Sequence, residues 1–285
     1  MPSANDAPDT QEKLVFWAAY GTMAAAEACL RDILRDARYA EPLRLERFGH
    51  KVYSQNDEDG ILQEIFRRIG AHSRRFVEIG VERGVENNTL ALLYSGWRGL
   101  WIEAQEQYLA AIRERFPRWI GEGRLALKGA IATAENLNGI LATAGMRGEI
   151  DLLSVDIDGN EYYLLEALSA VEPRVVVVEY NARFAPPIRW RIAYEPEFRW
   201  SGSDHCGASL ETLCDLMAKK GYALVGCNIT GVNAFFVRRD LAQGKFQEPF
   251  SAANHYQPAR YFLTHAYFNS AGGHGADPRD DGISG

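Results

Sequence analysis

Residues 76–84 read Phe-Val-Glu-Ile-Gly-Val-Glu-Arg-Gly, and this stretch decides the fold class. An apolar run carries one acid, Glu78, and is followed by Gly80 and Gly84. In an α/β sheet, the first glycine lets the chain leave a buried strand through a tight turn, and the second admits a ligand close to the backbone. The stretch therefore predicts the first strand of such a sheet, with a nucleotide-like ligand at the carboxyl end of that strand.

A second strand-like run ends in an acid about 20 residues after the first glycine. This acid is Glu103, in the run Leu-Trp-Ile-Glu at residues 100–103. A carboxylate at this distance can accept both hydroxyl groups of a cofactor ribose, whereas the alternative is a surface glutamate at the start of a helix. The first stretch is not GxGxxG and no Walker lysine follows it, so a phosphate cradle is disfavoured.

A pair of acids marks the end of a later strand-like run. Residues 150–161 read IDLLSVDIDGNE, so that Asp156 and Asp158 stand two positions apart where the strand ends. Both carboxylates can reach the mouth of the same site, where such a pair suits a general base, a divalent-cation ligand, or both. The alternative is an Asp-Gly turn with acids that cap the next helix.

Strand-like and helix-like stretches alternate from residue 75 to residue 180. The strand-like runs are continuously apolar, as expected of parallel strands that are covered on both faces, and repeated βα units imply a doubly wound sheet. We predict strands at 75–81, 99–104, 125–131, 150–156 and 174–180, and helices near 12–38, 57–69, 86–94, 106–116, 134–144, 161–168 and 209–220. The runs 222–227 and 233–238 are close enough to form a hairpin. This layout, a mostly parallel Rossmann-like α/β sheet with a C-terminal antiparallel hairpin and N-terminal helices, is typical of methyltransferases that use S-adenosylmethionine (SAM).

The motifs VEIGVERG, LWIEA, DLLSVDIDGNEYYLLEAL and VVVVEYN resemble those of FkbM-type methyltransferases, over about residues 75–181. The resemblance places Glu78, Gly80 and Gly84 on the SAM loop of that family, Glu103 on its ribose acid, and Asp156, Gly159 and Glu161 on its fourth-strand motif. Two positions depart from the family pattern, since its middle glutamate is Asp158 here and its commoner first aspartate is Glu78. Ala130, near the end of the third predicted strand, joins Asp156 in the predicted cofactor-binding set.

The chain also has a looser similarity to metal-dependent sugar O-methyltransferases. Those enzymes place Asp-x-Asp after the fourth strand and an acidic pair after the fifth. Asp156 and Asp158 match the first part, and Glu179 and Asn181 stand in the second, where Asn181 is the imperfect match. This similarity makes Asp156, Glu179 and Asn181 candidate metal ligands, and such hard oxygen donors favour Mg²⁺ over zinc.

Residues 181–208 are the predicted substrate loop. Aromatic faces suit a sugar ring or a planar acceptor, and arginines suit a phosphate or carboxylate handle, although most of the rings can equally pack the loop onto the domain. The loop carries Phe184, Trp190, Tyr194, Phe198 and Trp200 together with Arg183, Arg189, Arg191 and Arg199. His205 in this loop competes with Asp158 for the role of general base. His205 is slightly favoured, because an imidazole titrates near neutral pH whereas an aspartate near a cation would stay ionised and weakly basic.

Composition excludes several classes of protein. The chain has 285 residues and a net charge of −7, which argues against a general binder of nucleic acid or anionic membranes. Its four cysteines form no CxxC pair, so a zinc site has little support. The first residues are polar and do not resemble a signal peptide, so the cytoplasm is the expected compartment.

The predicted organisation has four parts. A disordered lead-in covers 1–11, a helical extension 12–70, the SAM-binding domain 71–245, and a C-terminal extension with a disordered tail 246–285. The apolar stripe of the first extension has to pack on the main domain or on a second subunit, which would make a homo-oligomer.

These features predict methyl transfer from SAM to an oxygen of a small hydroxylated acceptor, such as a sugar or glycoside. Two other classes stay open, a nicotinamide-dependent oxidoreductase and a non-catalytic interaction protein on a Rossmann fold. The missing GxGxxG counts against the first class. The set of Gly80, Gly84 and Glu103 counts against the second.

Overall fold

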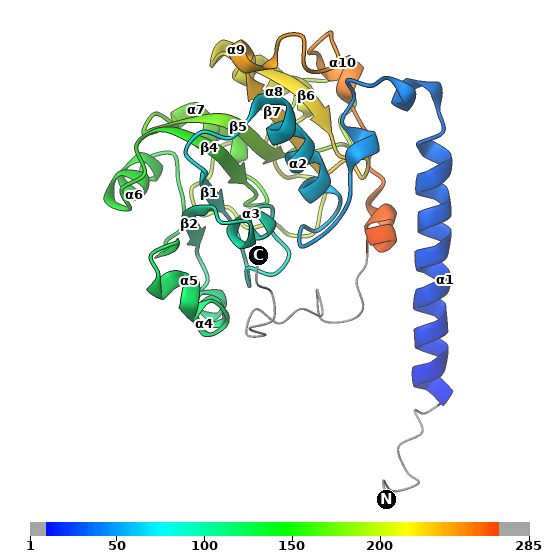
Figure 1. Ribbon diagram of the computed structural model, residues 1–285, viewed down its shortest axis with the longest axis horizontal. Coiled ribbons are helices and arrows are strands. Elements are labelled where there is room, and N and C mark those ends of the chain that lie inside the picture. Colours follow the sequence, from blue (N-terminus) through cyan, green and yellow to red (C-terminus); the bar gives the residue numbers. More distant parts are fainter. Residues whose placement is uncertain (1–9, 268–285) are drawn as a thin grey trace, which may run out of the picture.

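A twisted sheet with helices on both faces forms the body of the protein, and one long helix lies to the side of it (Figure 1). The computed structural model describes residues 10–267. Helix α1 (Thr10–Ile33) begins inside the predicted lead-in 1–11; the rest of that lead-in, and the predicted disordered tail, lie outside the described residues.

In the described part of the chain, seven strands form one sheet in the order β3-β2-β1-β4-β5-β7-β6. The parallel strands are β1 (Arg75–Ile79), β2 (Arg98–Glu103), β3 (Leu125–Gly129), β4 (Gly148–Val155) and β5 (Val171–Glu179). The last two strands, β6 (Tyr222–Cys227) and β7 (Asn233–Arg238), are antiparallel to each other, and β7 is antiparallel to β5. The predicted fold class, a mostly parallel Rossmann-like sheet with a C-terminal hairpin, is therefore confirmed.

Helices follow the strands in the predicted places, mostly with shorter bounds. They are α2 (Glu58–Ile69), α3 (Leu90–Tyr94), α4 (Glu106–Arg115), α5 (Pro117–Gly121), α6 (Leu137–Thr143), α7 (Glu161–Ala167), α8 (Leu210–Lys219), α9 (Arg239–Ala242) and α10 (Ala252–His255). Short 3-10 helices add η1 (Ala37–Ala40), η2 (Glu46–Phe48) and η3 (Tyr261–Tyr267). Helices α5, α9 and α10 were not predicted. Pro117 occupies the first position of α5, where a missing N–H costs no hydrogen bond.

The sheet separates two hydrophobic cores, and successive residues of β5 serve them in turn. Val176 and Val178 pack with α6, α7 and α8 on one face, whereas Val175 and Val177 pack with α2, α3, α4 and α5 on the other. All four side chains are buried, and burying one valine contributes about 1.5–3 kcal/mol. This two-sided burial explains the unbroken apolar run, because neither face of the strand meets water.

The N-terminal extension divides into two parts. Helix α2 packs into the second core through Ile61 and Ile65, so it belongs to the body of the protein. Helix α1 contacts the body near its C-terminal end, where Leu30 and Ile33 pack with Leu263. Within the described residues, no helix combines the length and the apolarity that crossing a membrane requires.

The loop before β1 depends on one buried carboxylate, Asp151 in β4. It accepts hydrogen bonds from the backbone N–H groups of His72, Ser73 and Arg74 at 2.8, 2.7 and 2.6 Å. The Nε of Arg174 lies 3.2 Å from the same carboxylate. The side chain is fully buried, so removing it would leave these donors without an acceptor.

We expect Asp151→Ala to lower the free energy of unfolding by about 2–4 kcal/mol, because three backbone N–H groups lose their acceptor and the Arg174 guanidinium loses one of its two carboxylate neighbours. Urea denaturation would measure this loss. Glu172→Ala, an exposed position in the adjacent strand β5, is the matched control and should change stability by less than about 0.5 kcal/mol. A loss below about 1 kcal/mol for Asp151→Ala would contradict this account of the loop.

Candidate active site

A cavity of about 1390 Å³ lies at the carboxyl ends of the parallel strands. The order of the sheet reverses between β1 and β4, and the crevice at such a reversal is where open α/β sheets bind ligands. The lining includes residues that follow β1, β2, β3, β4 and β5. This volume exceeds the 300–1,000 Å³ typical of a single ligand, so it has room for a cofactor and an acceptor.

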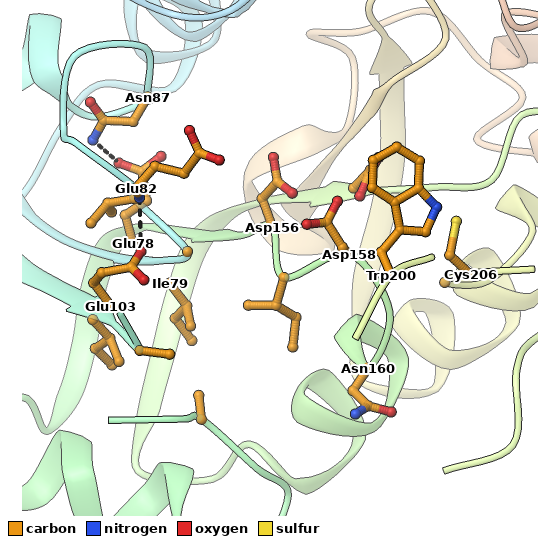
Figure 2. A pocket seen from close by; sticks show the side chains of 18 of the residues that line it. Glu78, Ile79, Glu82, Asn87, Glu103, Asp156, Asp158, Asn160, Trp200 and Cys206 are labelled. Carbon is orange, nitrogen blue, oxygen red and sulfur yellow. Dashed lines mark hydrogen bonds between the residues drawn. The ribbon is translucent and has the colours of Figure 1, made fainter. Parts of the chain in front are cut away.

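Glu78 shapes the loop that follows β1. Its carboxylate accepts hydrogen bonds from Asn87 Nδ2 at 2.7 Å, from the backbone N–H of Asn88 at 2.7 Å, and from both the N–H and the hydroxyl of Thr89. Figure 2 shows the bond from Asn87. Burial raises the pKa of Glu78, although these donors favour the carboxylate. These bonds engage both carboxylate oxygens of Glu78, which therefore holds the 80–89 loop in place beside the cavity.

A side chain at either glycine of the first motif would collide with other atoms of the protein. Gly80 has φ +80°, and a Cβ there would lie 1.7 Å from the backbone oxygen of Asp156. Gly84 has φ +70°, and its Cβ would lie 2.7 Å from the ring of Trp101. Gly80 lines the cavity, whereas Gly84 is buried and is not among the described residues that line it. The sequence predicted that a ligand approaches the backbone at Gly84, but the ring of Trp101 lies there instead.

Glu103 lies at the cavity wall with its carboxylate held by two backbone groups. Its Oε2 accepts the N–H of Glu82 (Figure 2) and its Oε1 the N–H of Gln105, both at 2.8 Å. The N–H of Ala130 donates to the carbonyl oxygen of Glu103 at 3.0 Å, which places Ala130 at the same wall. Beside it, Ile131 is 49% exposed and offers the cavity an apolar surface.

Three carboxylates meet at the other side of the cavity. One oxygen from each of Asp156, Asp158 and Glu179 lies within 4.8 Å of the others. Burial raises the pKa of Asp156 and Glu179 well above the ordinary range, and the neighbouring negative charges raise it further. Burial also raises the pKa of Asp158. In Figure 2, Asp156 and Asp158 project into the space between Glu103 and Trp200.

Glu161 holds the turn that carries Asp158. Its Oε1 accepts the N–H of Ile157 at 3.0 Å and that of Gly159 at 2.8 Å. Asp158 has φ +61°, a left-handed conformation that aspartate tolerates better than most residues. Burial raises the pKa of Glu161 to about 6 despite these bonds. The family motif is the signal that pointed to Glu161, which acts here by positioning Asp158.

Asn181, the predicted third metal ligand, holds the substrate loop. Its Nδ2 donates to the carbonyl oxygens of Asp204 at 2.7 Å and Cys206 at 3.0 Å, and its Oδ1 accepts the N–H of Arg183 at 3.1 Å. The third carboxylate of the cluster is instead Asp158. An amide that is committed to three loop contacts has less freedom to coordinate a cation.

The side chain of His205 is not part of the described lining of the cavity. Its side chain is exposed, and its ring lies edge-on to that of Trp190 with the centroids 5.5 Å apart. Among the described residues, its neighbours Asp204 and Cys206 line the cavity, but His205 does not. Burial raises the pKa of Cys206 to about 12, so its thiol stays protonated.

The loop arginines are mostly engaged elsewhere. Arg189 contacts Asp215 at 2.7 Å, the guanidinium carbon of Arg191 lies 4.4 Å from the ring centroid of Tyr162, and Arg183 lies 3.3 Å from Asp204. Arg199 lines the cavity with the rings of Phe198 and Trp200. The predicted arginine handle for a phosphate or carboxylate is therefore reduced to Arg199 among the loop arginines described.

The cavity has a strongly negative lining. Among the described residues that line it, nine are acidic and three are arginines: Glu78, Glu82, Glu86, Glu103, Asp156, Asp158, Glu179, Glu197 and Asp204 against Arg83, Arg115 and Arg199. A concave wall with one sign of charge raises the local concentration of ligands with the opposite sign. The lining therefore favours cationic or neutral ligands over anionic ones.

Residues from both extensions complete the cavity, and the motifs did not predict them. Tyr261 and Thr264 come from η3, and Gln55 comes from the segment before α2. The Oδ2 of Asp59 fixes that segment by accepting the N–H groups of Val52, Tyr53 and Ser54. Neither the segment that carries Gln55 nor the region of η3 contains one of the motifs named above.

No protein-family model matches the chain, and no curated protein matches it significantly. The chain is similar to many solved structures, including the following three. For the pyocyanin biosynthetic protein PhzM the identity is 20% and the TM-score 0.38, over 61% of this chain and 53% of that one, about half of its length. For the N-terminal domain of EvdMO1 with SAH bound the values are 19% and 0.41, over 73% and 94%. For the O-methyltransferase from Bacillus cereus in complex with SAH they are 17% and 0.42, over 82% and 91%. Because every TM-score is below 0.5, we draw no conclusion about activity from these similarities.

Proposed function

We propose that the chain is a SAM-dependent methyltransferase of the FkbM type, which methylates a hydroxyl oxygen of a small acceptor such as a sugar or glycoside. The observation that carries the proposal is Glu103, a carboxylate held by two backbone N–H groups at the end of β2, in a cavity at the reversal between β1 and β4. A carboxylate in this place suits the two hydroxyl groups of a ribose.

The charge of the cavity distinguishes SAM from a dinucleotide. SAM carries a sulfonium, an ammonium and a carboxylate group, and so one net positive charge. Among the described residues of the lining, nine acids against three arginines attract such a cation. The same wall repels the pyrophosphate of a nicotinamide cofactor, and the first motif is not the glycine pattern that binds one. Ala104, Ala130 and Ile131 offer apolar surface beside Glu103, where an adenine ring would lie.

The other side of the cavity fits the acceptor. Phe198 and Trp200 give it aromatic faces against which the ring of a sugar can pack. When bound, SAM supplies an electrophilic methyl group, and the acceptor oxygen forms the new C–O bond as the C–S bond breaks. The protein then has to align the acceptor and take its proton. We assign the proton to Asp158, because it lines the cavity whereas His205 does not.

Alternatively, Asp156, Asp158 and Glu179 would hold a divalent cation, and Asp158 would then be a ligand of that cation and not the base. Three carboxylate oxygens within 4.8 Å of one another form the hard donor set that Mg²⁺ prefers, and the repulsion among their negative charges is unfavourable without a cation between them. A cation there would lower the pKa of the acceptor hydroxyl and so assist its loss of the proton.

Glu103→Gln should weaken SAH binding about five- to 150-fold, the loss expected when a carboxylate that accepts hydrogen bonds becomes an amide. Calorimetric titration of both proteins with SAH measures the change. Glu106→Gln, at the exposed start of the next helix, should alter the dissociation constant by less than about threefold. Equal affinities of Glu103→Gln and the unaltered protein would remove the ribose role.

Mg²⁺ should raise the melting temperature of the unaltered protein, and the rise should vanish in Asp156→Asn, because the amide lacks the negative charge that attracts the cation. Glu197→Gln, another acid of the lining, is the control that should keep the rise. Activity should fall in excess chelator and return with Mg²⁺. Full activity in chelator would leave the three acids without a metal role.

Asp158→Asn should reduce turnover by a factor of about 10²–10⁴ while SAH still binds, because the acceptor proton loses its base or the cation one of its ligands. His205→Ala should keep nearly the full rate, since its ring is exposed beside Trp190. Transfer of labelled methyl groups to a panel of hexoses and glycosides provides the assay. The opposite ranking of the two variants would make His205 the base.

A further inference from the structure

The N-terminal half of α1 presents apolar side chains to solvent. The sequence has no charged residue from Leu14 to Ala26. Within this stretch five large apolar side chains are at least 51% exposed: Leu14, Val15, Phe16, Trp17 and Tyr20. Trp17 and Leu14 are the most exposed of them, at 68% and 66%. Figure 1 shows this part of α1 as the segment of the helix farthest from its connection to the body. Exposed apolar residues in such numbers mark an interaction surface, because an uncovered helix of this kind is unfavourable in water.

The C-terminal half of the same helix is anchored. Ala26 is buried, and Cys29, Leu30 and Ile33 pack beside Leu263 and Ile229. The anchor fixes one end of α1 and leaves another face of the helix open along its whole length.

We propose that this face pairs with the same face of a second copy of the chain, in antiparallel orientation. Leu14, Trp17, Gly21, Ala24 and Ala28 recur every three or four residues, so they lie on one side of the helix. The large side chains occupy its first half and the small ones its second half. An antiparallel crossing near Gly21 therefore sets the Leu14 and Trp17 side chains of each copy against the small residues Ala28 and Ala24 of the other.

Gly21 supports a crossing at this point. Glycine in a helix interior costs about 1 kcal/mol relative to alanine. Among the described residues, nothing lies within 4 Å of the position that a Cβ would occupy at Gly21. The fold of one copy thus gives no reason for glycine here, whereas a close approach of two helix backbones does.

The size and charge of the surface fit a second copy. Burying the exposed parts of Leu14, Trp17 and Tyr20 removes roughly 500 Å² per copy, or about 1,000 Å² in all, where specific interfaces begin. Lys13 and Glu27 bound the uncharged stretch, and both are exposed. An antiparallel pair brings each lysine near the glutamate of the other copy, whereas a parallel pair opposes like charges.

A membrane surface fits less well. The described charged side chains of α1 are Lys13, Glu27, Arg31 and Asp32, which sum to zero. The whole chain carries −7, so anionic lipid would repel it.

Sedimentation velocity of the full chain from about 1 to 100 μM tests the pairing. We expect a species of about twice the 31.9 kDa chain mass. Trp17→Glu should raise the dimer dissociation constant at least tenfold without changing the melting temperature. Ile188→Glu, at a residue 49% exposed away from α1, should leave the dimer intact. A monomer across this range, or a dimer that Trp17→Glu does not weaken, would overturn the proposal.

Disulfide formation tests the orientation. Gly21→Cys should cross-link to itself on oxidation, and the unaltered chain is the control. Leu14→Cys should not, because an antiparallel crossing at residue 21 puts the two positions roughly 20 Å apart, far beyond the reach of a disulfide. Cross-linking of both variants would overturn the antiparallel arrangement. The unaltered chain could instead be a monomer that binds phosphatidylcholine vesicles. If Trp17→Glu abolished that binding, lipid and not a second copy would cover this face of α1.

Discussion

The site depends on the close approach between Gly80, which follows β1, and the backbone oxygen of Asp156, which follows β4. No side chain fits between them, so the two strand ends come together at the point where the sheet reverses its winding. The N–H of Gly80 also donates to the carbonyl of Ile102 in β2, at 2.9 Å. This one residue therefore ties three neighbouring strand ends, and with them Glu103 and Asp156, to the wall of one cavity. The geometry that the proposed chemistry needs is set by backbone contacts and not by mobile side chains.

A second layer of buried acids stabilises the loops around this junction. Glu78 holds the 80–89 loop, Glu161 holds the turn with Asp158, and Asp59 holds the segment with Gln55. Each accepts backbone N–H groups that would otherwise be buried without a partner. These acids add to the negative charge of the region. The pKa values of Asp156 and Glu179 are raised first by burial and then by neighbouring negative charges, among them Glu161. A cationic cofactor, with or without a divalent cation, is the kind of ligand that offsets this negative charge.

The sequence predicted the sheet well, because two-sided burial leaves a plain signal. The run Val175–Val178 is apolar throughout since each successive side chain enters one of the two cores. The ends of the strands were predicted within a few residues, and the hairpin at its observed bounds. Contacts between distant segments were harder. The need for glycine at position 84 comes from the ring of Trp101, which no local pattern announces.

The candidate site was predicted in part. The acids at the ends of β2 and β4 stand at the cavity, as their place after buried strands implied. His205 was chosen for its residue type and Asn181 for its match to a motif after the fifth strand, but both lie in a loop whose fold depends on contacts with distant residues. Asn181 binds Asp204 and Cys206, and His205 packs against Trp190. Tyr261 and Gln55 reach the cavity from opposite ends of the chain, which only the tertiary structure brings together.

The central claim is that the cavity takes a cationic nucleoside cofactor, and calorimetric titration of the unaltered protein tests it most directly. The protein would be titrated in parallel with SAM and with NAD⁺ under the same buffer and salt. We expect saturable binding of one SAM per chain and no detectable binding of NAD⁺. Binding of NAD⁺ without SAM, or of neither, would contradict the account.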